Sequence, residues 1–191
     1  MRGALALAAL ALSLILSGCG GSSSTTPTDA SSQTLAPATR LPDLEHPDRS
    51  ATLFSHFNAD QGVPRLVLLV SPTCPTCLTG ASWVRRHILE RYPTAKLHVY
   101  AIWIPVLAGD NKTAWDKDVL DDPRVTQLWD AQQIVGSWLQ AHGGAFWDTF
   151  LIYGPDTRWD SEPEGSLASG SPIIGATDEL EQGLLPLIGK R

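Results

Sequence analysis

The stretch "VLLVSPTCPTCLTGASWVRRHIL", residues 67–89, holds Cys74 and Cys77, two of the three cysteines of this 191-residue chain. The residues just before the pair, 66–70, are continuously apolar and rich in branched side chains, which is typical of a strand buried on both faces. After the pair, apolar residues recur at helical spacing, so a helix is expected over residues 77–92. The cysteines should therefore lie where a buried strand passes into a helix.

Further elements follow from the same kind of pattern. A second buried strand is expected over residues 96–107, and it completes a parallel strand–helix–strand unit with a right-handed crossover. The remaining expected elements are a helix over 122–142 beginning at Asp122-Pro123, a third strand over 145–154, a weak strand over 172–174, and a last helix from Asp178 with Glu181 completing a capping box.

The N-terminus, "MRGALALAALALSLILSGC", has one basic residue and an apolar run over residues 4–16. This run is typical of a signal peptide and is short for a membrane span. Its end, Leu16-Ser17-Gly18-Cys19, resembles the lipobox of bacterial lipoproteins. The resemblance implies cleavage after residue 18, a lipidated Cys19, and a protein anchored to a bacterial membrane in the cell envelope, on the periplasmic or extracytoplasmic face. The alternative is an ordinary secretory signal with a chance cysteine.

Residues 19–40 are mostly Gly, Ser, Thr, Pro and Ala, which indicates a flexible tether, and the folded domain is expected over residues 41–191. If Cys19 carries lipid, two thiols remain in this domain. A disulfide between Cys74 and Cys77 would close a very small loop and would add little as a structural staple. A chemical role for the pair is the stronger interpretation.

The order strand, CxxC motif, helix, strand, helix, strand and terminal helix resembles thioredoxin-like proteins over about residues 50–190. The resemblance implies an α/β, thioredoxin-like three-layer sandwich with a central mixed sheet and flanking helices. It also implies thiol–disulfide exchange with protein thiols and disulfides of the envelope. Cys74 would be the attacking nucleophile and Cys77 the resolving cysteine. No cofactor besides the redox-active disulfide is expected.

The placement suits this chemistry because the attacking species is a thiolate, and unpaired N–H groups at a helix N-terminus stabilise negative charge. Cys74 should lie at that end and be more exposed than Cys77. Pro75 removes one backbone donor and stiffens the loop, and Thr76 can donate a hydrogen bond to a sulfur.

The chain departs from thioredoxins at two places. Thioredoxins carry a buried aspartate in the strand before the motif, whereas here that strand is apolar. Thioredoxin-like proteins also place a cis-proline before the third strand, where this chain has Phe146-Trp147-Asp148, and Pro172 comes later. Trp147 or Asp148 is therefore expected to face the thiols, and Asp148 is a candidate proton acceptor.

Two other interpretations remain open. One is a thioredoxin-like lipoprotein that binds a partner without catalysis, and the other is a copper or zinc site using the cysteine pair. The histidines are scattered, so no metal ligand is assigned among them: His46, His56, His87, His98 and His142. The net charge of −6 argues against nucleic-acid binding. The acidic residues from Asp110 to Asp122 are interpreted as a cluster exposed to solvent, a solvated cluster. The protein is expected to be a monomer.

Overall fold

The computed structural model describes residues 47–160 and 162–189, with the side chains from Leu53 onward. The expected signal peptide, Cys19 and the tether lie outside these residues. The helices are α1 (Pro47–Ala59), α2 (Pro75–Val84), α3 (Ile134–Ala141) and α4 (Thr177–Ile188), with a π-helical turn η1 (Arg85–Leu89) and 3₁₀ turns η2 (Lys117–Leu120) and η3 (Ile173–Gly175). The strands are β1 (Arg65–Val70), β2 (His98–Trp103), β3 (Val125–Trp129), β4 (Thr149–Tyr153) and β5 (Ala168–Gly170).

The five strands form one mixed sheet in the order β3-β2-β1-β4-β5. The β1–β2 and β2–β3 pairs are parallel, and β4 runs antiparallel to both β1 and β5. The central strand is β1, in which Leu68 pairs with Ala101 on one side and Phe150 on the other. The expected parallel unit around the CxxC motif is confirmed, and it places the motif at the carboxyl end of the central strand.

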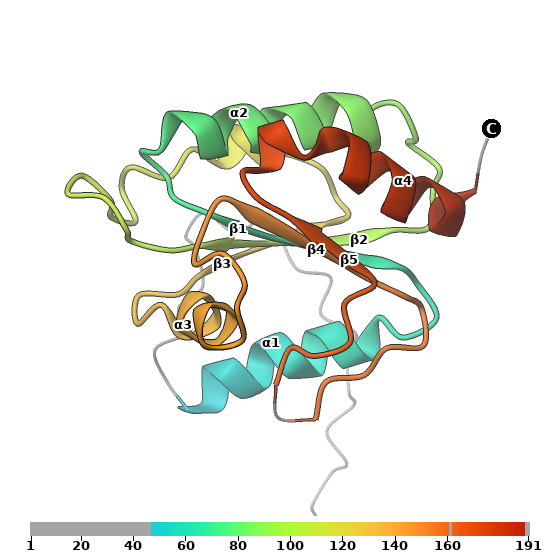
Figure 1. Ribbon diagram of the computed structural model, residues 1–191, viewed down its shortest axis with the longest axis horizontal. Coiled ribbons are helices and arrows are strands. Elements are labelled where there is room, and N and C mark those ends of the chain that lie inside the picture. Colours follow the sequence, from blue (N-terminus) through green and yellow to red (C-terminus); the bar gives the residue numbers. More distant parts are fainter. Residues whose placement is uncertain (1–46, 161, 190–191) are drawn as a thin grey trace, which may run out of the picture. The chain divides into compact units, whose positions relative to one another are not determined.

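Two apolar cores lie on opposite faces of this sheet. Successive side chains of a strand point to opposite faces, so Leu68 enters one core and Leu69 the other. Helices α2 and α4 cover the first core, and α1 and α3 cover the second (Figure 1). This is the expected three-layer, thioredoxin-like architecture.

The expected helix over residues 122–142 is wrong. Its first part is the edge strand β3, and only Ile134–Ala141 is helical. Apolar residues at positions 125, 128 and 129 have spacings that also suit a helix. In the strand, however, Val125 and Trp129 face the first core and Leu128 faces the second. Just after the strand, the buried carboxylate of Asp130 accepts a hydrogen bond at 2.9 Å from the Val135 N–H in the first turn of α3.

Two smaller expectations also need correction. The weak strand expected over 172–174 falls on Pro172 and the turn η3 that follows it, and the strand that pairs in the sheet is β5, which ends at Gly170. Helix α4 has Ala176 as its N-cap, without a side-chain cap, so the expected capping box at Asp178 is not formed.

Helix α1 was not expected at all. Its Leu53 and Phe57, one turn apart, are buried in the second core.

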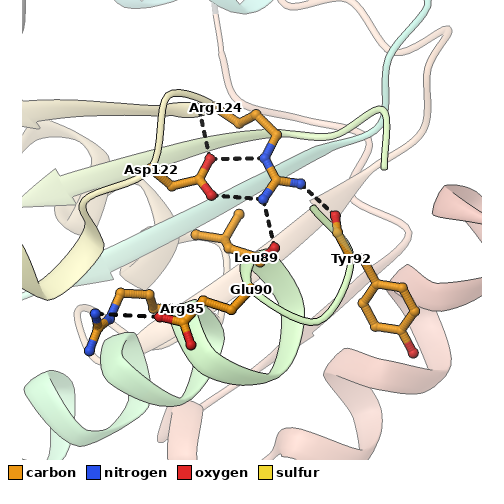
Figure 2. Close-up of polar contacts among 6 residues, drawn as sticks. All are labelled: Arg85, Leu89, Glu90, Tyr92, Asp122 and Arg124. Atoms are coloured by element: carbon orange, nitrogen blue, oxygen red, sulfur yellow. Dashed lines mark hydrogen bonds and ion pairs between the residues drawn. The ribbon is translucent and has the colours of Figure 1, made fainter. Parts of the chain in front are cut away.

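The segment that begins at the CxxC motif is helical from Pro75 to Leu89, close to the expected range of 77–92, although its last turn is π-helical. Arg124, just before β3, holds the end of that turn. Its guanidinium donates to the carbonyls of Leu89 and Tyr92, both at 2.8 Å, and forms a two-pronged pair with Asp122 (Figure 2). Both groups of the pair are mostly buried, so Asp122 is not part of a solvated cluster, contrary to expectation.

None of the helices in the described part of the chain has the length and apolar character needed to cross a membrane.

Candidate functional site

Cys74 is the N-cap of α2 and Pro75 is its first residue. The proline fits there because the first helical N–H has no intrahelical acceptor. Cys77 lies in the first turn. Both cysteines are free thiols, Cys74 is 6% exposed, and Cys77 is fully buried. The expected order of exposure is therefore found, although both sulfurs are largely covered.

Two polar groups face the Cys74 sulfur. The Cys77 N–H donates to Sγ at 3.4 Å, and the Thr76 hydroxyl lies 3.1 Å from the same atom. An anionic sulfur at this position would gain both contacts in addition to the partial positive charge of the helix N-terminus. Thr76 thus stands where it can make the hydrogen bond to sulfur that the sequence suggested.

Asp148 lies beside the two thiols. A carboxylate oxygen of Asp148 and the sulfurs of Cys74 and Cys77 are all within 4.8 Å of one another, and Asp148 is only 5% exposed. Its other role is structural, because Oδ1 accepts a hydrogen bond from the Ile173 N–H at 3.2 Å. The same turn contains the cis Ser171–Pro172 bond. Trp147, the other candidate neighbour, is 39% exposed, and its ring packs edge-to-face on Phe146.

Two glycines allow helices to pack closely against the segments around Asp148. A Cβ on Gly136 of α3 would lie 2.6 Å from the Phe146 carbonyl, so α3 can approach the loop that carries Asp148 only because this residue is glycine. A Cβ on Gly80 of α2 would likewise lie 2.7 Å from Cβ of Ile173. Asp148 adopts φ +51°, a left-handed conformation that aspartate and asparagine tolerate better than most residues.

The surroundings of Cys77 disfavour its thiolate form. Burial raises the pKa of the Cys77 thiol well above its usual value, and the hydrogen bond to the Cys74 sulfur and the charge of Asp148 act in the same direction. A protonated Cys77 can attack another sulfur only after it loses its proton. The nearby carboxylate of Asp148 is a group that could accept that proton.

The same three side chains could also hold a metal ion. Among the described residues, Cys74, Cys77 and Asp148 are the group of potential ligands whose atoms come this close together. Two thiolates and a carboxylate are ligands that Zn²⁺ accepts, and a three-ligand site leaves one position open.

Sequence reasoning missed Asp110, which was assigned to a solvated acidic cluster. Its carboxylate is partly buried and contacts Ser71 and Thr73, the residues that lead into the CxxC motif. The predicted parallel pairing of the two strands was the available signal. The carboxyl ends of neighbouring parallel strands lie at one edge of a sheet, which brings the loops after β1 and β2 together.

No protein-family model and no curated protein sequence matches the chain. Among solved structures it is similar to a Chlorobium tepidum protein assigned as the thiol:disulfide interchange protein DsbE, with 15% identity and a TM-score of 0.48 over 70% of this chain and 85% of that one. The thioredoxin domain of a Bacteroides vulgatus thiol-disulfide oxidoreductase has 13% identity and a TM-score of 0.43 over 64% and 82%. A secreted Mycobacterium tuberculosis disulfide oxidoreductase homologous to E. coli DsbE has 17% identity and a TM-score of 0.40 over 65% and 84%.

Proposed function

We propose that this chain is a thiol–disulfide oxidoreductase whose Cys74–Cys77 pair cycles between dithiol and disulfide. The observation that carries the proposal is the cluster of two thiols and the Asp148 carboxylate at the N-terminus of α2, with ligand atoms within 4.8 Å of one another. A structural disulfide would need no proton acceptor and would gain little from this small loop.

In the reducing direction, the Cys74 thiolate attacks one sulfur of a substrate disulfide. A mixed disulfide forms, and the other substrate sulfur leaves as a thiolate. Cys77 then gives its proton to Asp148 and attacks Cys74 Sγ, which releases the second substrate thiolate and leaves the Cys74–Cys77 disulfide. The substrate gains two electrons and the pair loses two. The reverse sequence oxidises a substrate dithiol, and the potentials of the partners set the direction.

The first test is the reduction potential of the pair, measured in the chain from residue 19 onward with Cys19→Ser, by equilibration with glutathione and alkylation of free thiols. Catalytic pairs lie at roughly −270 to −120 mV, whereas inert structural bridges lie below about −300 mV. A value in the catalytic span, together with exchange that Cys74→Ser abolishes and Cys77→Ser traps as a mixed disulfide, supports the proposal. A very negative potential would overturn it and favour a non-catalytic binding module, whereas exchange that survives Cys74→Ser would overturn the two-cysteine mechanism proposed here.

The proposed setting is the cell envelope, with lipid on Cys19 and the 19–40 segment as a tether. The support is the lipobox-like sequence and the way lipidation leaves two thiols for the folded domain. Partners would then be protein thiols or disulfides near the same membrane face. Labelling of the expressed protein with a radioactive fatty acid, lost in Cys19→Ser, tests this anchor.

A metal site is the second candidate, and the Cys74–Cys77–Asp148 cluster favours it as well. Addition of Co²⁺ to the reduced protein provides the test, since thiolate ligands give it intense charge-transfer absorption. Stoichiometric binding that is lost in Asp148→Asn would support the metal site, and absence of a spectrum would exclude Co²⁺ binding there.

A further inference from the structure

Asp110 lies in the loop after β2 and joins this loop to the one after β1. Its Oδ1 accepts hydrogen bonds from the Thr73 N–H at 3.1 Å and from the Thr73 hydroxyl at 2.6 Å. Its Oδ2 accepts from the Ser71 hydroxyl at 2.8 Å and from the N–H groups of Val106 and Leu107, both at 2.7 Å. One carboxylate therefore receives five donors from two separate segments.

The segment it holds leads directly to the nucleophile. The last backbone bond between β1 and β2 is the one from the Ile104 N–H to the Val70 carbonyl, after which the two strands separate. Pro72 has no N–H, and the Thr73 N–H is directed to Asp110 rather than to the sheet. The Cys74 N–H in turn donates to the Ser71 carbonyl at a long 3.4 Å. Asp110 is thus the side chain that ties residues 71–73 to the loop after β2.

The charge state of Asp110 suits this role. Partial burial alone would raise the pKa of its carboxyl, but the hydrogen bonds from Thr73, Leu107, Ser71 and Val106 outweigh burial and lower it. The group is ionised at neutral pH, and hydrogen bonds to an ionised acceptor are roughly twice as strong as neutral ones.

We propose that Asp110 is a positioning residue for thiol–disulfide exchange, which acts through Ser71 and Thr73 to fix the place of Cys74 relative to Cys77. The inference rests on the proposed function and deepens it. Asp110 touches neither sulfur. By holding the residues before the N-cap it keeps Cys74 Sγ close to Cys77, so the two thiols have a high effective concentration toward each other. Loss of the tie frees the loop and disfavours closure of the disulfide.

The test compares Asp110→Asn with a matched control, Asp118→Asn, in which the exposed carboxylate of η2 loses its charge away from this loop. Asparagine keeps the shape of aspartate but turns an N–H₂ group toward one set of donors. Three quantities are measured: the equilibrium constant for disulfide formation with glutathione, the rate of closure from the mixed disulfide, and the urea midpoint.

We expect the equilibrium constant of Asp110→Asn to fall about tenfold, equivalent to a potential less negative by about 30 mV, with a slower closure rate. Asp118→Asn should match the wild type. An equilibrium constant and closure rate unchanged in folded Asp110→Asn, with or without a shifted urea midpoint, would overturn the positioning role. A wild type without any exchange would instead refute the proposed function.

A second variant keeps the test decisive if Asp110→Asn does not fold. Thr73→Val is close to isosteric and removes the hydroxyl donor while Asp110 stays charged. We expect a smaller change in the same direction, and a double variant whose effect is less than the sum of the two single effects. A Thr73→Val protein with wild-type equilibrium constant and closure rate would contradict the proposal independently.

Discussion

A carboxylate oxygen of Asp148 lies within 4.8 Å of the Cys77 sulfur, and both residues are almost fully buried. Two effects of opposite sign follow from this proximity. The negative charge of Asp148 helps to raise the pKa of the Cys77 thiol, which disfavours the thiolate. The same carboxylate can accept the proton when Cys77 attacks. Removal of the charge distinguishes the two effects.

Asp148→Asn retains the oxygen that accepts from Ile173 and suits the left-handed backbone, so the loop should be preserved. If Asp148 is the proton acceptor, resolution of the mixed disulfide slows about 10²-fold at pH 7. It should then recover as the pH rises and hydroxide replaces the lost base. Stopped-flow resolution of a mixed disulfide with glutathione measures this. Faster resolution in Asp148→Asn would mean that the charge only opposes the thiolate. Asp178→Asn, an exposed acid of α4, is the control.

The architecture could be predicted from the sequence where a local pattern and a tertiary contact agree. Strand β1 reads as buried on both faces, and both faces are covered by helices. The 122–142 segment failed because spacing alone does not distinguish the edge strand β3 from a helix when apolar residues suit both. Helix α1 was missed because its polar composition hides two buried anchors, Leu53 and Phe57.

The candidate site could be predicted in part. Cys74, Cys77 and Asp148 were chosen from motif and position, and the structure brings their side chains together. Asp110 was misjudged because its partners, Ser71 and Thr73, are more than 35 residues away in the chain. The signal was the predicted parallel pairing of β1 and β2, which brings the loops after the two strands together, and not any pattern local to Asp110.

Replacement of Arg124 should destabilise the fold strongly. Arg124→Ala leaves the Asp122 carboxylate and the carbonyls of Leu89 and Tyr92 without their donor (Figure 2), so we expect a loss of about 2–4 kcal/mol in the free energy of unfolding by urea. Arg124→Lys should recover little, because an ammonium group does not reproduce the two-pronged geometry.

The control for Arg124 is Glu90→Gln, which breaks the pair between Arg85 and Glu90 at 3.5 Å (Figure 2). The Glu90 side chain is 55% exposed, so its loss should cost at most about 1 kcal/mol. Equal effects of Arg124→Ala and Glu90→Gln would contradict a special role for the buried pair.

Asp122 should give the stability an acid-sensitive component. The hydrogen bond from Arg124 is the main cause of the lowered pKa of Asp122 in the fold, and the reference value in an unfolded chain is about 3.9. The folded state therefore binds fewer protons than the unfolded one in this range, and stability rises with pH. The contribution is complete above about pH 5 and is lost as the pH falls through the unfolded and then the folded pKa.

Urea midpoints of wild type and Asp122→Asn from pH 7 to pH 2.5 or so measure this component. The difference between the two proteins should be largest at neutral pH and narrow below about pH 4. Asp160→Asn, whose carboxylate is almost fully exposed, should follow the wild type throughout. A wild-type advantage over Asp122→Asn that stays constant over the whole range would show that the pair contributes through shape rather than charge.

Gly80→Ala should disturb the site through packing. An alanine in a helix interior normally stabilises by up to about 1 kcal/mol relative to glycine. Here the added Cβ would lie 2.7 Å from Cβ of Ile173 and 3.3 Å from the Ile174 nitrogen, so η3 must move away from α2. Because the Ile173 N–H bonds Asp148, that movement reaches the thiols. We expect a net destabilisation of about 1–3 kcal/mol and slower resolution of the mixed disulfide. A stabilised Gly80→Ala protein with unchanged resolution of the mixed disulfide would refute this coupling.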